Sequence, residues 1–343
     1  MPDATSGSLV DLRVARAAAR LVMPRSNASA ADAEALRVAV RAELPEIDAA
    51  ARRWTELGEG LPPTEVRVVG RMGWIEANLG VVGAMFDRIA DRVRTRPAGS
   101  AQIVGVQLGT LFGLLSTRVL GQFVLPLAGP GAGQLVVVGP NVLDLASRSP
   151  GVADDLRRTV LLHEVAHRLQ FDGVPWLGGH LRGLVANYLD EGPTDPASIL
   201  RIVQRLPGAV VDALRGGGVE PIMQALLTAA QVTTLDRAQA LMSLLEGHGN
   251  ATMHLATASV VEDPAAVEAA LDERREDLAG KVLRQVAGMQ RKARQYAEGE
   301  AFVRHVVDEA GVPRLNRAFE GPDHLPTMDE IGDPASWLAR TAA

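Results

Sequence analysis

The sequence predicts a mainly α-helical protein of the α+β type, in which a helix with two histidines four residues apart packs beside a small β-hairpin or sheet within a large helical body. Most of the 343 residues lie in stretches rich in Ala, Leu, Val and Arg, with apolar residues every three or four positions, which is the helical period. One interval instead has two short apolar runs separated by a glycine-rich turn, a pattern that is typical of a hairpin.

The expected elements follow in chain order. Apolar spacing predicts helices over residues 9–22, 30–57, 64–94, 100–117, 151–171, 177–190, 196–205, 208–214, 219–230, 234–259, 264–276 and 278–311. Residues 122–127 and 134–138 predict two strands, because both runs are apolar and a glycine-rich turn joins them. The tail from Asn316 onward contains several prolines, so we expect it to wrap over the body and not to form one helix.

No linker clearly divides the chain, so we expect one compact unit. Within it, we expect residues 1–117 to form an N-terminal helical part and residues 118–343 to form a second part that contains His163 and His167. The three glycines at 216–218 are the best candidate for a hinge.

Composition excludes several classes of protein. The chain has no cysteine, which excludes thiolate metal sites, cysteine nucleophiles and disulfides and fits a reducing compartment. The net charge of -6 disfavours a nucleic-acid binder. The N-terminus has charged residues in every apolar stretch and is no signal peptide, and the most apolar window, over 103–115, is shorter than the roughly 20 residues that span a bilayer. We therefore expect a cytoplasmic protein with neither nucleic-acid nor membrane partners.

The strongest chemical signal is the segment His163-Glu164-Val165-Ala166-His167. Histidines four residues apart lie on one face of a helix, where both imidazoles can bind one zinc ion. Leu156 and Val160 continue that face, so we expect the rings to point inward. Glu164 lies about 100° around the helix from His163, so it can take a proton from water without being a ligand. A solvated polar helix face is the alternative interpretation.

A catalytic zinc ion needs a third protein ligand and an open position for water. A third histidine in the metzincin position is missing, since Asp172 and Gly173 follow His167 there. Glu246 is the better candidate, because it follows largely apolar residues on a predicted helix and needs a partner. His180 is its rival, since a turn after the motif helix could bring it back toward the metal.

Four further side chains are candidates for supporting or substrate-binding roles, as is His180. Asn250 lies one helical turn after Glu246 and could orient a histidine ligand. His248, His254 and Tyr188 could stabilise a negatively charged oxygen in a transition state, although a lone histidine on a helix is more often structural. The strand over 134–138 could receive a peptide along its edge or be a buried hairpin strand.

Beyond the metal motif, several blocks of sequence occur in an order that resembles one family. The blocks are Val68–Trp74 with Asn78, Leu135–Asn141, Leu162–His167 with Gln170, Phe171, Val174–Leu177 and His180, Leu245–His248, and Leu325–Thr327 with Glu330, Ile331, Trp337 and Leu338. Through them the chain resembles a family of zincin-like metallopeptidases, or hydrolases, from actinobacteria and related phyla, which is labelled as associated with deazaflavin-coenzyme biosynthesis. The resemblance covers most of the chain.

The resemblance implies a mostly helical zincin fold, a zinc ion and hydrolase activity, without naming a substrate. The chain departs from the family pattern at Asn250, where an acidic residue is usual, and at His254, where aspartate is frequent. Nothing in the sequence suggests a flavin or nucleotide pocket.

The sequence as a whole predicts a zinc-dependent hydrolase that acts on a peptide or a small amide. His163, His167 and Glu246 are the expected ligands, and Glu164 is the expected general base. The alternative is an inactive zinc-binding interaction or scaffold protein. Retention of Glu164 speaks against it, because a purely structural zinc site has no need of that carboxylate.

Overall fold

The computed structural model describes residues 8–90, 99–129, 131–191, 228–276 and 289–342. The helices expected over 196–205 and 208–214, nearly all of the helix over 219–230, and the glycines at 216–218 lie outside the described residues.

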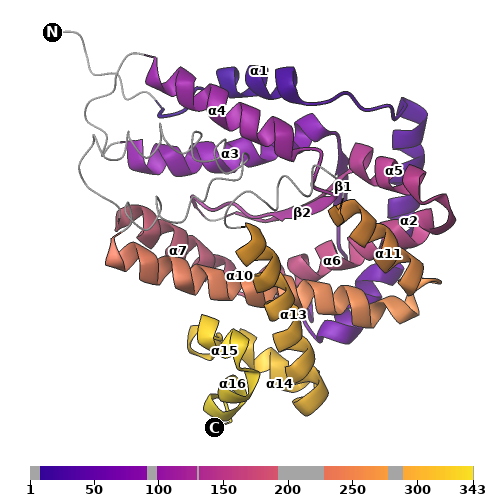
Figure 1. The fold of residues 1–343 in the computed structure, drawn as a ribbon, viewed down its shortest axis with the longest axis vertical. Coiled ribbons are helices and arrows are strands. Elements are labelled where there is room, and N and C mark those ends of the chain that lie inside the picture. The colour runs from indigo at the N-terminus through magenta and orange to yellow at the C-terminus, as the bar shows by residue number, and fades with distance from the viewer. Residues whose placement is uncertain (1–7, 91–98, 130, 192–227, 277–288, 343) are drawn as a thin grey trace.

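Helices dominate the described chain, and three short strands lie among them (Figure 1). In chain order the elements are α1 (Leu12–Val22), α2 (Ala30–Thr55), β1 (Val66–Val69), α3 (Arg71–Ala90), α4 (Ser100–Leu115), β2 (Gly121–Val124), β3 (Gln134–Val138), α5 (Gly139–Arg148), α6 (Ala153–Gly173), α7 (Leu177–Asp190), α10 (Ala229–Ala256), α11 (Pro264–Glu276), α13 (Met289–Ala310), α14 (Val312–Asn316), α15 (Met328–Gly332) and α16 (Pro334–Arg340). The predicted fold class, a mainly helical body with a small sheet beside the motif helix, is confirmed.

The three strands form one mixed sheet in the order β1-β3-β2. Strand β1 pairs in parallel with β3, and Val66 is opposite Leu135. Strand β2 pairs antiparallel with β3, and Gly121 is opposite Val137. Strand β3 therefore lies in the centre of the sheet, and among the described residues both of its neighbours are edge strands.

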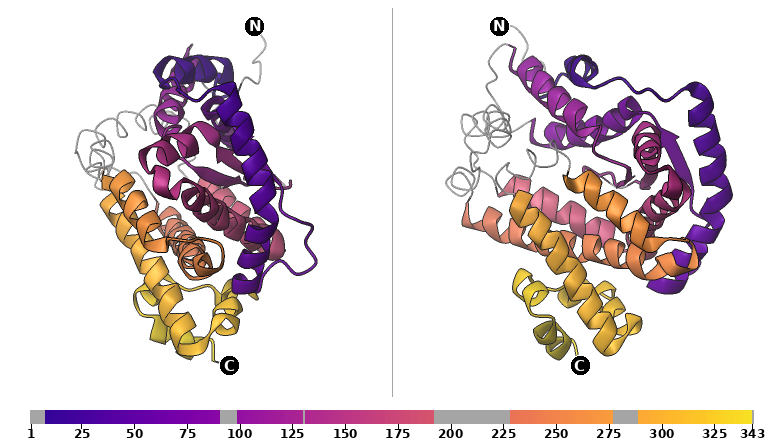
Figure 2. Two further views of the ribbon diagram at one scale, coloured as in Figure 1. Left: turned by 90° about the vertical axis from the view of Figure 1, so that its right-hand side faces the viewer. Right: turned by 45° about the vertical axis from the view of Figure 1, so that its right-hand side comes forward.

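Alternate residues of β3 enter two different cores, as expected for a strand covered on both faces. Leu135 and Val137 pack with residues of α2, α5 and α6, whereas Val136 and Val138 pack with residues of α1, α3 and α4. Helices α1, α3 and α4 accordingly lie on one side of the sheet, and α6, α7 and α10 lie on the other (Figures 1 and 2).

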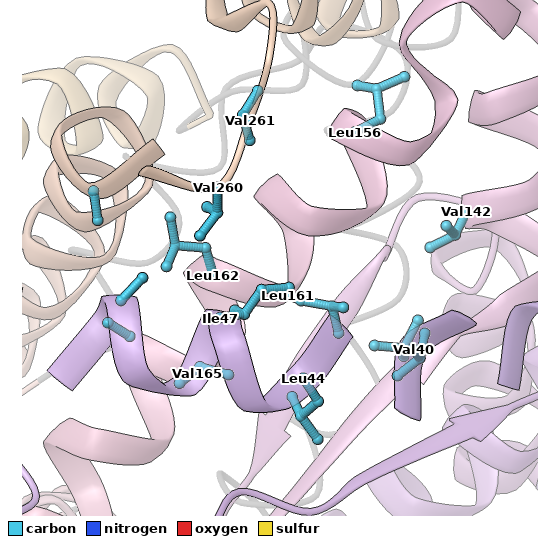
Figure 3. Packing of buried hydrophobic residues seen from close by; sticks show 14 of the residues in the cluster. Val40, Leu44, Ile47, Val142, Leu156, Leu161, Leu162, Val165, Val260 and Val261 are labelled. Atoms are coloured by element: carbon cyan, nitrogen blue, oxygen red, sulfur yellow. The ribbon is translucent and has the colours of Figure 1, made fainter. Parts of the chain in front are cut away.

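The core on the α6 side joins distant parts of the sequence. Leu44 and Ile47 of α2 lie against Leu161 and Val165 of α6, and Figure 3 shows these side chains together with Val260, from the segment after α10. Helix α6 is thus packed over much of its surface, which gives the motif that it carries a rigid support. The division of the chain at residues 117 and 118 stays a prediction.

The C-terminal tail forms short helices, α14 to α16, that pack on α10 and α13 at one end of the molecule (Figure 2). Trp337 of α16 is fully buried there and donates from its indole N–H to the carbonyl of His324. The expectation that the proline-containing tail covers the body is confirmed.

The structure corrects three of the expected elements. The helix expected over 64–94 is wrong at its start, because the valine-rich run Val66–Val69 pairs with β3 as strand β1. Helix α5 was not expected, yet it begins at Gly139 with Pro140 in its first turn, where a missing N–H costs little. Strand β2 ends at Val124, before Pro126. None of the described helices is long and apolar enough to cross a membrane.

Candidate metal centre

Helix α6 presents both histidines of the motif on one face, as their spacing predicts. The Nε2 atoms of His163 and His167 are 3.1 Å apart, and the ring planes are perpendicular with their centroids 4.6 Å apart. Both side chains are largely buried, with exposed fractions of 19% and 12%. Val160 and Leu156 are buried one and two turns before His163, respectively, so the expected inward direction of the motif is observed.

Helix α10 brings Glu246 to the same point. Its Oε2 atom lies 3.7 Å from Nε2 of His163 and 3.8 Å from Nε2 of His167. Within the described part of the chain, these three residues form the group of His, Cys, Asp and Glu side chains that is close enough to hold a metal ion. His180, the rival third ligand, is not a member of this group.

The three side chains fit a divalent ion in both chemistry and spacing. Two imidazole nitrogens and a carboxylate oxygen are a ligand set found in catalytic zinc sites, where each atom is about 2.0–2.2 Å from the metal. Two ligand atoms at that distance and at a tetrahedral angle are about 3.4 Å apart. The observed separations of 3.1, 3.7 and 3.8 Å lie on either side of this value, so small rotations of the side chains are enough to close the set.

Glu164 lies beside this cluster and is almost fully buried, with 6% of its surface exposed. Its carboxylate accepts a hydrogen bond from the backbone N–H of Phe123 in β2, which lowers its pKa. Burial has the larger effect and raises the pKa to about 7, while His167 lowers it and Glu246 raises it. The Oε2 atom has no hydrogen-bond partner among the described residues. Such a carboxyl group is poised to exchange a proton near neutral pH.

Two glycines make room for these side chains. A Cβ atom on Gly121 of β2 would lie 2.5 Å from Cγ of Glu164, and one on Gly249 of α10 would lie 3.1 Å from Cε1 of His163 and 3.2 Å from Cε1 of His167. The backbones of β2 and α10 therefore approach Glu164 and the two imidazoles so closely that a larger residue would need its neighbours to move. Sequence reasoning missed both glycines, because their role depends on contacts between elements far apart in the chain.

A buried glutamine on α6, Gln170, was also missed as a functional residue. Its Oε1 atom is 2.9 Å from Nδ1 of His167, and its Nε2 atom is 3.0 Å from the carbonyl oxygen of Leu245 and 2.8 Å from Nδ1 of His248. The role of orienting a histidine was expected of Asn250, which is half-buried on α10. A signal was present, since Gln170 follows His167 by three residues and so lies on the same helix face.

The other candidates lie in varied surroundings. His248 is fully buried between the rings of Trp54 and Phe319, and burial lowers its pKa to about 3, so it is neutral. His254 is 3.7 Å from a carboxylate oxygen of Glu300 on α13.

His180 and Tyr188 both lie on α7. The ring of His180 contacts Trp176 edge to face. Burial is the main cause that lowers the pKa of His180, and the positive charge of Arg237 lowers it further. Burial raises the pKa of Tyr188. No hydrogen bond between described residues joins either side chain to Glu246 or Glu164, so their expected roles toward substrate stay predictions.

Strand β3 cannot receive a peptide along its edge, because β1 and β2 pair with its two sides. The buried alternative for residues 134–138 is therefore the correct one. The edge strand nearest the cluster is β2, which contacts Glu164 through Gly121 and Phe123.

Comparison with known proteins agrees with this geometry. The sequence pattern of the family described as zincin-like metallopeptidase matches residues 10–338. Among solved structures, the chain is similar to a candidate hydrolase with a novel fold from Chloroflexus aurantiacus, with 28% sequence identity and a TM-score of 0.69 over 97% of this chain and 99% of that chain. Among curated proteins, none matches the chain.

Proposed function

We propose that this chain, which belongs to the zincin-like metallopeptidase family, is a zinc-dependent hydrolase that cleaves a peptide or a small amide. The observation that carries the proposal is the convergence of His163, His167 and Glu246 beside the buried carboxyl group of Glu164. The family description supports a peptide as the substrate. The finer resemblance, to members from actinobacteria with a deazaflavin-coenzyme label, stays a prediction from the sequence blocks.

In this proposal His163, His167 and Glu246 hold the ion. A zinc ion bound there supplies a Lewis acid that polarises the scissile carbonyl and makes a water molecule more acidic. Glu164 accepts the proton of the attacking water and then gives it to the leaving nitrogen. Its pKa of about 7 supports both transfers, because the carboxyl group then gains and loses a proton at similar cost near neutral pH.

The surroundings of Glu164 favour the hydrolase over an inactive zinc-binding scaffold. A buried carboxyl group whose pKa is raised by burial is costly to keep charged, and a structural zinc site gains nothing from it. A peptide in extended conformation has a suitable neighbour in β2, an edge strand that contacts Glu164.

The direct test measures bound zinc and hydrolysis in the same protein samples. We expect about one zinc ion per chain in the wild type and in Glu164→Gln, and loss of zinc in His163→Ala. Glu164→Gln should hydrolyse a mixed peptide library, followed by mass spectrometry, about 10²–10⁴-fold more slowly than the wild type. Glu268→Gln, an exposed change on α11, is the matched control. Unchanged hydrolysis by Glu164→Gln would exclude Glu164 as the base.

A further inference from the structure

The side-chain amide of Gln170 is fully buried and bridges α6 and α10. It faces three groups within hydrogen-bond distance: Nδ1 of His167 on its own helix, and the carbonyl oxygen of Leu245 and Nδ1 of His248 on α10. An amide has one acceptor oxygen and two N–H donors. The three neighbours therefore use the whole hydrogen-bonding capacity of the two N–H groups and one lone pair of the oxygen.

The carbonyl of Leu245 determines which way the amide points. A carbonyl oxygen only accepts hydrogen bonds, so the NH₂ group of Gln170 must face it. The reverse orientation would place two acceptor oxygens 3.0 Å apart in a buried setting, which is costly. The Oε1 atom of Gln170 is thereby directed to His167.

This orientation decides the tautomer of His167. Because Oε1 of Gln170 accepts, Nδ1 of His167 must carry the proton. The Nε2 atom of His167 then has a free lone pair, and it is this atom that lies 3.1 Å from Nε2 of His163 and 3.8 Å from Oε2 of Glu246. The metal-facing nitrogen is thus the one that is ready to bind a cation.

The same reasoning assigns the proton of His248. The second N–H of Gln170 points at Nδ1 of His248, 2.8 Å away, so that nitrogen must accept and the proton must be on Nε2. This Nε2 atom has no hydrogen-bond partner among the described residues; the ring lies against those of Trp54 and Phe319. His248 thus acts as an acceptor that holds the amide in place.

We propose that Gln170 is a positioning residue that, held by the Leu245 carbonyl and by His248, fixes His167 in the tautomer whose Nε2 lone pair faces His163 and Glu246. The functional meaning of this assignment rests on the proposed zinc hydrolase. The hydrogen-bond assignment itself can be tested on metal-free protein.

The first test needs no substitution in the network. Long-range ¹H–¹⁵N correlation spectra of metal-free protein labelled with ¹⁵N-histidine distinguish the two neutral tautomers, and single His→Gln variants assign the signals. We expect His167 to carry its proton on Nδ1 and His248 to carry its proton on Nε2. A proton on Nε2 of metal-free His167 overturns the proposal.

Two substitutions of similar size then separate the acceptor and donor roles of the amide. Gln170→Met removes both, and we expect zinc affinity to fall about 10–100-fold, as for other residues that orient a histidine ligand. Gln170→Glu keeps an acceptor for His167 but has no N–H for His248 or for the carbonyl of Leu245. We expect His167 to keep its tautomer in this variant and His248 to move its proton to Nδ1.

Gln102→Met, an exposed change on α4 outside the network, is the control for the substitution of a glutamine by methionine and should leave both spectra and zinc affinity unchanged. Circular dichroism checks that each variant is folded. Zinc affinity of folded Gln170→Met within twofold of the wild type would overturn the positioning role. If the wild type has the expected tautomers and binds zinc but cuts no peptide, the hydrolase proposal fails and the assignment of Gln170 stands.

Discussion

Helix α10 meets two neighbours through adjacent residues, and the two contacts differ in kind. Toward α6 it presents Glu246 and His248, whose polar atoms face the imidazole and amide groups of α6. Toward α13 it presents Gly247, where a Cβ atom would overlap the backbone of Gly299. The glycine contact sets the position of α10 by close backbone packing, and the polar contact brings Glu246 close to His163 and His167. Stability and metal binding should therefore respond to different substitutions one residue apart.

Removal of Glu246 should have the largest effect, and it should change zinc affinity much more than stability. Glu246→Ala takes away a proposed ligand, so we expect zinc affinity to fall more than about 100-fold, since even residues behind the ligands cost 10–100-fold. The metal-free variant should unfold at nearly the same urea concentration as the metal-free wild type, because 27% of the Glu246 side chain is exposed to solvent and its removal leaves the apolar core intact. Asp236→Ala, exposed on the same helix, is the control. Unchanged zinc affinity in Glu246→Ala would remove it from the ligand set.

The stability of the metal-free protein should also depend on pH, through Glu164 beside the polar contact. Burial raises the pKa of Glu164 from 4.5 to about 7 in the folded protein. Between these values the unfolded chain has lost a proton that the folded chain keeps, so stability falls as pH rises. We expect the contribution of Glu164 to the free energy of unfolding of the metal-free protein to fall by up to about 3 kcal/mol between pH 4.5 and 7.

Urea unfolding in the presence of a chelator at pH 5 and pH 8 measures the change. Glu164→Gln should remove this fall, because it has no proton to lose, and leave the opposite contribution of His248, whose lowered pKa makes stability rise with pH. Gly247→Ala should keep both contributions. Equal slopes in wild type and Glu164→Gln would show that Glu164 has an ordinary pKa in the folded protein.

On the apolar side, Gly247→Ala should reduce stability. The added methyl group meets the Gly299 backbone, which cannot move without displacing α13, so we expect a loss of about 1–3 kcal/mol. Zinc affinity per folded molecule should change little. Urea unfolding and zinc titration of the folded protein measure the two quantities, and Gly332→Ala, with open space around its Cβ position, is the control.

The smallest expected effect is that of Gly249→Ala. Its Cβ would be 3.1–3.2 Å from atoms of two imidazole rings, and side chains can yield where a backbone cannot. We expect stability to change by less than about 1 kcal/mol and zinc affinity to fall by about tenfold or less, within the range for residues behind the ligands. If Gly249→Ala lost more stability than Gly247→Ala, the contact with α6 and not the contact with α13 would be the one that sets the position of α10.

Much of the site could be predicted from sequence because its parts obey local rules. The spacing of His163 and His167 sets their common face whatever the rest of the fold does. Glu246 was predicted as a ligand from its apolar sequence neighbours, since a carboxylate among apolar residues needs a partner, and the structure brings it close to both histidines. By contrast, Gln170 acts through the carbonyl of Leu245, and no local pattern announces a hydrogen bond between residues 75 positions apart.

The sheet shows the same limit. Residues 134–138 were recognised as a strand from their valines, but their central place depends on β1, which belongs to a region whose apolar spacing favours a helix. A four-residue strand has too few residues to outweigh the twenty-residue helix that follows it in any local count. Pairing with β3 decides its conformation, and that pairing is a tertiary contact.

The parallel pairing of β1 with β3 has a consequence for how the molecule can be divided. Val66 and Leu135 must meet across 69 positions of sequence before the central strand has both of its neighbours, a non-local contact of the kind that slows folding. A fragment that began after α4 would leave the hydrogen-bonding groups of one side of β3 open. That open edge would favour self-association over correct folding, so limited proteolysis, domain swapping and expression of the C-terminal part alone are all constrained by one four-residue strand.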